Sequence, residues 1–223
     1  MSILLIGATG RTGRLVAEKL HAAAIPFCPL IRNAAKRDEF ERLGAHPLIA
    51  DLAGDFSNAF AGMHTVIYAA GSAETEGAEQ ERLIDRDALI KSVDYAKQHG
   101  VVLFVVISVL LAYQPERSPQ TLRHYTQMKR ESDDYVIASG LDYLVLRPGT
   151  LTMEPGVGTI QIMSDVESPR APVAREDVAD VVLAALKAGM VNKVIGFAGS
   201  PVPIAQRSAQ CLRRPGSSQR SPL

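Results

Sequence analysis

The sequence of 223 residues has few of the residues that mark disulfide-rich or metal-binding proteins. It contains two cysteines, Cys28 and Cys211, which lie far apart and form no C-x-x-C pattern. This argues against a disulfide scaffold or a zinc site and fits a reducing cytoplasm. The five histidines show no H-E-x-x-H or other ligand spacing, so we expect no bound metal.

The sequence also lacks an excess of charge and a long apolar run. Lysine plus arginine equals aspartate plus glutamate, at 24 each, so no net field favours nucleic acid or an anionic membrane. The longest apolar run, Val101 to Ala112, is shorter than the roughly 18 residues that span a bilayer. No basic leader precedes the first apolar segment. We therefore expect a cytoplasmic protein that binds a small-molecule substrate.

A glycine-rich turn follows the first apolar run of the chain. Residues 3–6 are all apolar, and Gly7, Gly10 and Gly13 follow at G-x-x-G-x-x-G spacing before a helical pattern. The first glycine permits a tight turn, the second lets backbone approach a pyrophosphate, and the third lets the new helix pack closely. Free N–H groups and the dipole at the helix start favour an anion. This context of strand, glycine loop and helix predicts a dinucleotide-binding loop.

The second predicted strand, residues 27–31, bears on the choice between NAD and NADP. Arg32 and Asn33 follow it, about 20 residues past the glycine loop, where an NAD-specific fold places an acid for the ribose 2′-OH. No acid occurs there before Asp38, whereas Arg32 offers a planar guanidinium to a 2′-phosphate. We expect NADP(H), and less readily NAD(H). The alternative is that Arg32 is an ordinary exposed loop cation.

Two further strand ends are candidates for the cofactor site. Asp51 and Leu52 follow a predicted third strand, and they either contact the adenine or cap the turn that leads to residues 55–63. Ala69, Ala70 and Gly71 end the fourth, where small residues let a cofactor lie against the sheet. Packing alone also explains the small residues at positions 69–71.

Alternation of strands and helices predicts a doubly wound, mostly parallel α/β sheet of about seven strands. We expect one domain over residues 1–204, with a small substrate-side segment near 150–172. Residues 205–223 carry arginines, serines and prolines without an acid, which predicts a loose tail or, alternatively, a basic docking tail. The predicted strands span residues 3–6, 27–31, 45–50, 64–70, 101–107, 141–147 and 194–198, with a small extra strand at 159–163.

These motifs resemble those of the short-chain dehydrogenase/reductase superfamily over about residues 3–204. The resemblance is strongest to its atypical NAD(P)-binding branch of biliverdin-reductase-B-like and NmrA-like proteins. It rests on the glycine loop, Asp51-Leu52, Ala69-Ala70-Gly71, the strand that ends at Ser108, residues 139–149 and residues 174–179. It implies that the pyrophosphate is held by Thr9, Gly10, Arg11, Thr12 and Gly13, and that the 2′-phosphate is held by Arg32. It also implies that Ala69 to Gly71 line the adenosine and that Pro148 lies beside the nicotinamide.

Tyr125 and Lys129 have the Y-x-x-x-K spacing of catalytic short-chain reductases. At positions i and i+4 of a predicted helix, both side chains lie on one face. In the mechanism of those reductases, the Lys129 ammonium lowers the pKa of the Tyr125 phenol, and Tyr125 passes a proton to the carbonyl oxygen of the substrate. Lys129 also forms a hydrogen bond with the nicotinamide ribose, and Ser108 holds the substrate carbonyl. Tyr125 is otherwise an aromatic residue that lines the pocket.

Two classes of function remain open. The first is an NADPH-dependent reductase or epimerase-like enzyme that acts on a small carbonyl, quinone or flavin-like substrate. The second is a non-catalytic NADP(H)-binding redox sensor of the NmrA-like type, with a protein partner. The register of Ser108, Tyr125 and Lys129 favours the enzyme, while the lack of a second hydroxyl residue after Ser108 favours the sensor. Either reading allows a monomer or a dimer.

Overall fold

The apolar runs of the sequence form one twisted sheet in a computed structural model, which describes residues 2–72, 75–163 and 171–203. Its strands are β1 (Ile3–Ile6), β2 (Phe27–Ile31), β3 (Leu48–Ile49), β4 (Thr65–Tyr68), β5 (Leu103–Ile107), β6 (Asp142–Pro148), β8 (Thr159–Met163) and β10 (Lys193–Pro203). They lie in the order β3-β2-β1-β4-β5-β6-β10-β8. All neighbouring pairs are parallel except β8 and β10, so the predicted doubly wound sheet is confirmed.

The strand order sets the position of the ligand site. From β1 the chain first builds outward through β2 to β3, and then returns to place β4 on the other side of β1. The chain leaves β1 for α1 (Arg11–Ala22) on one face of the sheet and leaves β4 for α4 (Ala88–Gln98) on the other face. Open α/β sheets bind ligands at this switch point.

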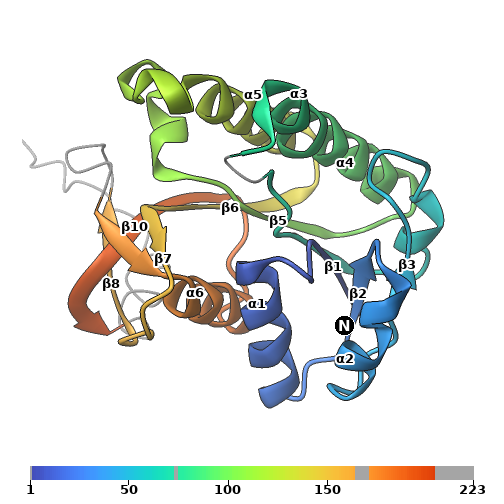
Figure 1. Cartoon of the computed structure of the whole chain (residues 1–223). Helices are drawn as coiled ribbons and strands as arrows, with labels where there is room; N and C mark the ends of the chain where they lie inside the picture. Colours follow the sequence, from blue (N-terminus) through green and yellow to red (C-terminus); the bar gives the residue numbers. More distant parts are fainter. Residues whose placement is uncertain (1, 73–74, 164–170, 204–223) are drawn as a thin grey trace, which may run out of the picture.

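Helices cover both faces of the sheet (Figure 1). One face carries α1 (Arg11–Ala22), α2 (Arg37–Glu41) and α6 (Arg175–Lys187), and the other carries α4 (Ala88–Gln98) and α5 (Arg123–Ala138). Alternate residues of β1 serve the two layers: Ile3 and Leu5 pack with α1 and α6, while Leu4 and Ile6 pack with α4 and α5. Because both faces are buried, β1 needs no polar residues, which explains its unbroken apolar sequence.

The structure adds elements that the sequence patterns did not predict. β7 (Thr150–Thr152) and β9 (Pro172–Ala174) form a separate parallel pair at the two ends of the segment predicted to lie on the substrate side. The predicted third strand, residues 45–50, is reduced to the two residues of β3. Ahead of α4 lie α3 (Gly77–Gln80) and a π-helical segment, Glu81–Asp87, which leads directly into α4. The stretch 109–123 holds three short 3-10 helices: Leu110–Tyr113, Pro115–Arg117 and Gln120–Leu122.

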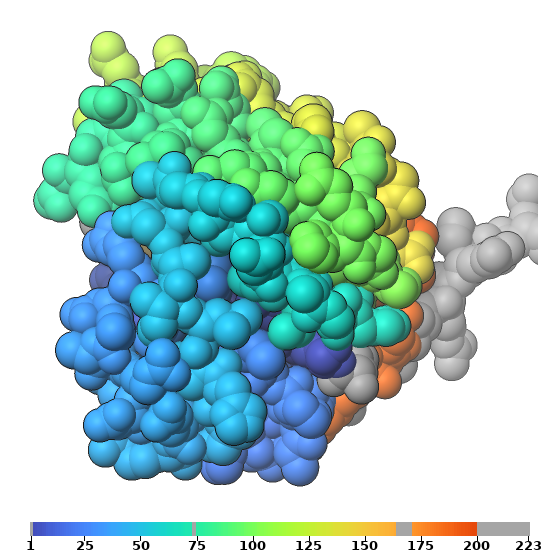
Figure 2. Space-filling model, turned by 90° about the vertical axis from the view of Figure 1, so that its right-hand side faces the viewer, coloured from blue at the N-terminus to red at the C-terminus, as the bar shows by residue number. Residues whose placement is uncertain are grey.

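Figure 2 shows the molecule from the β3 edge. The blue and cyan segments around β2, α2 and β3 lie below, and the green helices α4 and α5 lie above. Within the described ranges, no helix combines the length and the apolar character needed to cross a bilayer. The tail predicted for residues 205–223 lies outside the described residues.

Candidate active site

The three glycines of the first loop have different physical roles. Gly7 has a φ of 81°, in the left-handed region that disfavours a side chain, and a Cβ there would overlap the backbone of Ala70. A Cβ on Gly13 would overlap the Gly7 carbonyl oxygen. A Cβ on Gly10 would lie 3.2 Å from that oxygen, with nothing else within 4 Å. Gly7 and Gly13 thus serve close packing, while Gly10 leaves its outer side open.

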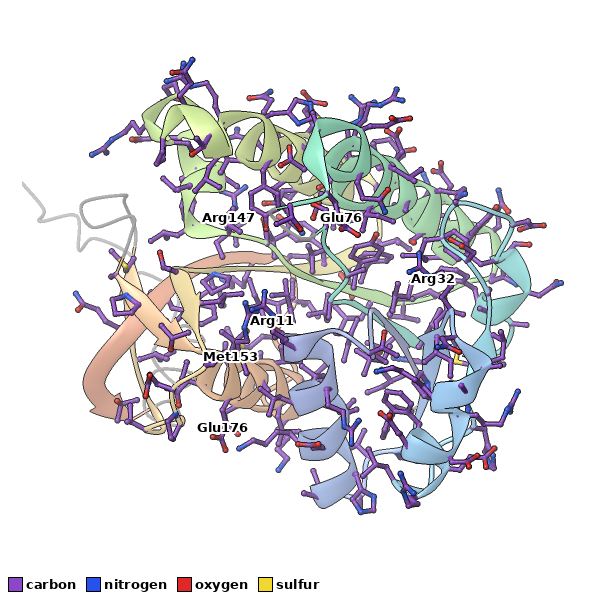
Figure 3. The ribbon with its side chains drawn as sticks, in the orientation of Figure 1. Arg11, Arg32, Glu76, Arg147, Met153 and Glu176 are labelled. Atoms are coloured by element: carbon purple, nitrogen blue, oxygen red, sulfur yellow. The ribbon has the colours of Figure 1, made fainter. Side chains whose placement is uncertain are left out.

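The loop presents an anion site at the start of α1. Gly10 is the N-cap, and the first intrahelical bond runs from Arg14 N–H to Gly10 C=O, at 2.9 Å. The N–H groups of residues 11–13 therefore have no partner one turn earlier. Thr9, Gly10 and Arg11 are exposed, and Figure 3 shows Arg11 where α1 begins. The open glycine, the helix N-terminus and the exposed arginine together fit a dinucleotide pyrophosphate.

Replacement of Gly13 by alanine is expected to destabilise the fold by about 1–3 kcal/mol, because the methyl group meets backbone that cannot move aside. Gly10→Ala is the matched control. It should destabilise the fold less than Gly13→Ala, because its methyl group lies 3.2 Å from the Gly7 carbonyl oxygen and not within overlap of it, and it should weaken dinucleotide binding. Urea denaturation and NADPH titration of both variants separate the two effects. Equal stability of the two variants would contradict the packing role of Gly13.

The other predicted cofactor residues lie at the same edge of the sheet. Ala69 N–H donates to Ile6 C=O at 2.9 Å, so the exits of β4 and β1 lie together, and Gly71 is exposed beyond them. Arg32 is exposed at the end of β2, apart from Arg11 in Figure 3. Asn33 and Asp51 are exposed, but each side chain also has a local role.

Asn33 and Asp51 accept hydrogen bonds within their own turns. Asn33 Oδ1 accepts from Ala35 N–H at 2.9 Å, and Asp51 Oδ1 accepts from Ala53 N–H at 2.9 Å. Of the two roles that the sequence left open for Asp51, this geometry supplies the turn cap. Leu52, next in the chain, is partly exposed.

Lys129 projects from α5 to the end of β4. Its Nζ lies 2.9 Å from Asp85 Oδ1, and a Cβ placed on Gly71 would lie 3.8 Å from the same Nζ. The lysine is 2% exposed and Asp85 is fully buried. Burial by itself lowers the pKa of an amine, but the Asp85 carboxylate, together with Tyr125 and Asp133, outweighs burial and raises the pKa of Lys129. Lys129 is thus a charged group directly behind the open backbone of Gly71.

Tyr125 lies one turn earlier on α5 and is partly exposed. Lys129 Nζ is 5.8 Å from the centre of its ring. Burial, together with the Asp85 and Asp133 carboxylates, raises the pKa of Tyr125, although Lys129 and Arg175 pull it down. The expected lowering of the phenol pKa by Lys129 is therefore offset, and Tyr125 keeps its proton at neutral pH.

Ser108 belongs to a second buried cluster. Its Oγ donates to Asp133 Oδ2 at 2.7 Å, and Arg147 Nε donates to the same oxygen at 2.9 Å. Arg147 also stacks on the ring of Tyr113, 4.3 Å from its centre. Because the single O–H of Ser108 is used by Asp133, this hydroxyl has only lone pairs left for a substrate. The structure thus gives Ser108 and Lys129 different acidic partners.

The substrate-side segment is tied to the start of α6. Glu176 accepts from Gly156 N–H at 3.0 Å, and Asp177 accepts from Gly158 N–H at 2.7 Å. The hydrogen bond from Gly156, with the nearby Lys19, lowers the pKa of Glu176. Arg175, which precedes them, donates from Nη1 to Thr12 Oγ1 at 2.9 Å. The first turn of α6 therefore links this segment to the glycine loop. Pro148 is buried at the end of β6, just before this segment in the chain.

Sequence reasoning missed the acids of this site. Asp85 and Asp133 were not predicted as site residues, yet Asp85 pairs with the predicted Lys129. Asp133 likewise accepts a hydrogen bond from the predicted Ser108. A signal was present for Asp85, which lies four residues before Leu89 and eight before Val93 and so falls on the apolar face of its helix. An acid on a buried helix face requires a partner.

Comparison with known proteins places the chain among dinucleotide-binding proteins. The family described as NAD(P)H-binding matches residues 7–188. An uncharacterized sugar epimerase of Bacillus subtilis is 32% identical over 211 residues, which cover 92% of this chain and 98% of that protein. A provisionally named NAD-dependent epimerase/dehydratase from Bacillus halodurans has a TM-score of 0.90 at 31% identity and covers 94% of this chain and 99% of its own.

A more distant structure, an anaerobillin reductase from Escherichia coli O157:H7, shares the fold with a TM-score of 0.74 at 22% identity, over 91% of this chain and 98% of its own. The predicted resemblance to NAD(P)-binding Rossmann proteins is confirmed. With the family match over most of the chain and the glycine loop at the β1–β4 switch point, the chain belongs to the NAD(P)H-binding family of Rossmann-fold proteins.

Proposed function

We propose that this protein is an NADP(H)-dependent reductase that acts on a small carbonyl, quinone or flavin-like substrate. The observation that carries the proposal is the buried Lys129 ammonium behind Gly71, with the Tyr125 phenol one helical turn away on the same face. A cation and a proton donor thus lie together at the edge where the family binds its cofactor. The name of a relative that is 32% identical includes epimerase, and that of a structure with the same fold includes reductase, which supports an enzymatic role.

A reduced nicotinamide, when bound, supplies the hydride. The residues of this chain would orient the reactants and deliver the proton. Residues 9–13 would hold the pyrophosphate, Lys129 would donate to the nicotinamide ribose, and Pro148 would border the ring. The protonated Tyr125 hydroxyl would donate to the substrate oxygen and give up its proton as negative charge develops there. Ser108, whose proton is used by Asp133, would shape this pocket.

The preference for NADP(H) is assigned to Arg32. Arg32→Ala should weaken NADPH binding by about 10- to 150-fold, the equivalent of losing one charge-assisted contact of about 1.5–3 kcal/mol. NADH has no 2′-phosphate, so its affinity should change little. Fluorescence titration with both cofactors measures the ratio.

Arg42→Ala removes an equally exposed arginine at the end of α2, and it serves as the control for general loss of positive charge. It should leave both affinities unchanged. Equal losses of NADPH and NADH in Arg32→Ala would refute the assignment of the 2′-phosphate to Arg32.

A non-catalytic NADP(H) sensor is the second candidate, and a specific observation favours it. Lys129 and Ser108 are each bound to a buried acid, Asp85 and Asp133, so each already has a polar partner without a substrate. Titration with NADPH and NADH, followed by a panel of carbonyls, quinones and flavins, separates the candidates. Tight NADPH binding with turnover supports the reductase. Tight binding without turnover on any substrate supports the sensor and directs the search to a protein partner.

A further inference from the structure

Asp85 is the centre of a buried junction between three segments of the chain. One carboxylate oxygen, Oδ1, lies 2.9 Å from Lys129 Nζ on α5. The other, Oδ2, accepts from the backbone N–H of Ser72 at 3.1 Å and from its hydroxyl at 2.5 Å. The loop after β4, the π-helical segment and α5 therefore meet at one fully buried carboxylate.

The π-helical segment aims Asp85 at this junction. The segment Glu81–Asp87 is anchored to β4 by the Tyr68 hydroxyl, which donates to Ile84 C=O at 2.6 Å. A π-helix inserts an extra residue into the helical turn and so rotates the residues that follow, and such insertions are frequent at functional sites. Here the distorted turn carries the acid that pairs with the lysine behind Gly71.

The charge on Lys129 depends on this acid. Among the described residues, the ionisable groups that act on the amine are Asp85 from the π-helical segment, and Tyr125 and Asp133 from α5 itself. The facing loop after β4 contributes the uncharged Gly71 and Ser72. Tyr125 is neutral at physiological pH, and Asp133 is already paired with Arg147. Asp85 is thus the direct counter-charge of a lysine that is 2% exposed.

We propose that Asp85 is a positioning residue that keeps Lys129 as an ammonium and fixes it behind Gly71, where it would meet the cofactor ribose. This inference deepens the proposed function and rests on it for the role of Lys129 toward the cofactor. Asp85 itself is covered by Lys129 and Ser72 and acts only through the lysine. Its effect is therefore on the charge and position of Lys129.

The first test follows the titration of Lys129 directly, in the protein without cofactor. Lysine labelled with 13C at Cε reports each amine by NMR, and Lys129→Met identifies the signal among the seven lysines of the chain. In the native protein the Lys129 signal should not titrate below its ordinary pKa of about 10.4. In Asp85→Asn, which keeps the shape but loses the charge, the midpoint should fall by about 3–5 pH units because the amine is buried.

Ser72→Ala is the matched control, because it removes a hydroxyl bond to Asp85 and leaves the charge pair in place. Its Lys129 midpoint should equal that of the native protein. A native Lys129 that titrates well below its ordinary pKa would overturn the inference without any variant, even if Asp85→Asn failed to fold. An unchanged midpoint in a folded Asp85→Asn would overturn it as well.

The second test measures how the charge on Lys129 affects cofactor binding. In Asp85→Asn, NADPH affinity should equal the native value below the new Lys129 midpoint and fall by about tenfold above it, where the neutral amine bonds more weakly. In the Lys129→Met background, Asp85→Asn should cause no further loss, because Asp85 acts through the lysine. A further loss in the double variant would show an independent role and overturn the proposal.

The two tests separate this inference from the proposed function. If Lys129→Met leaves NADPH affinity unchanged, the proposed contact between Lys129 and the ribose is wrong, whatever the titration shows. If that contact holds but the Lys129 midpoint does not move in Asp85→Asn, the proposed function stands and the role of Asp85 is wrong.

Discussion

Replacement of Tyr125 by phenylalanine is expected to lower the rate of reduction of an accepted substrate by about 10²- to 10⁴-fold, the usual contribution of a positioned general acid. NADPH affinity should stay nearly unchanged, because the ring and its contact with Lys129 remain. The pKa of Tyr125 is raised, so the native rate should hold through neutral pH and fall only at alkaline pH, as the phenol loses its proton. Nicotinamide absorbance measures both the rate and its pH profile.

Tyr135→Phe is the control on the same helix. Its hydroxyl donates to Asp94 at 2.7 Å on the surface, so its removal should not affect turnover. Full turnover in Tyr125→Phe would contradict the proton-donor role and leave Tyr125 as an aromatic residue that lines the pocket. An equal loss in both variants would point to a disturbance of α5 and not to proton transfer.

The succession of strands along the chain and the glycine-rich turn after the first of them could be predicted because their signals are local. A strand buried on both faces is an unbroken apolar run, as in β1, and a loop that approaches another backbone needs glycine at fixed spacing. β2 and β8 occur with the predicted bounds, and β6 is shifted by one residue. β7 and β9 were missed because each has only three residues, too few for a period, and they pair across a long separation.

The candidate site could be predicted only in part, for the same reason. Tyr125 and Lys129 share a helix, so their spacing was enough to place them on one face. Their acidic partner comes from another element, and the distortion that directs Asp85 inward has no sequence pattern of its own. The roles expected for Lys129 and Ser108 assumed free polar groups, whereas tertiary contacts give each of them a buried carboxylate.

The second large effect is expected from Arg147→Met, which should destabilise the protein by about 3–5 kcal/mol, because it leaves the buried Asp133 without its counter-charge. Both side chains are almost inaccessible, at 4% and 0% exposed. Methionine fills much of the same volume, so the loss is one of charge. Arg147→Met combined with Asp133→Leu should recover most of the stability, because a buried pair replaced by apolar groups costs little. Urea denaturation measures each free energy of unfolding.

The pH dependence of this loss separates charge from packing. Burial raises the pKa of Asp133 in the native protein, against the opposing effects of Arg147 and Ser108, and without Arg147 the pKa rises further. A carboxyl with a raised folded pKa contributes stability below its unfolded pKa of about 3.9 and loses it as pH rises through the folded value. The deficit of Arg147→Met should therefore shrink as pH falls from neutral.

Arg37→Met is the surface control for Arg147→Met. It breaks a helical pair with Glu41 at 3.7 Å whose side chains are both well exposed, and it should cost less than about 1 kcal/mol. A deficit of Arg147→Met that stays constant with pH would mean that lost contact with the Tyr113 ring, and not the uncompensated Asp133 charge, destabilises the protein.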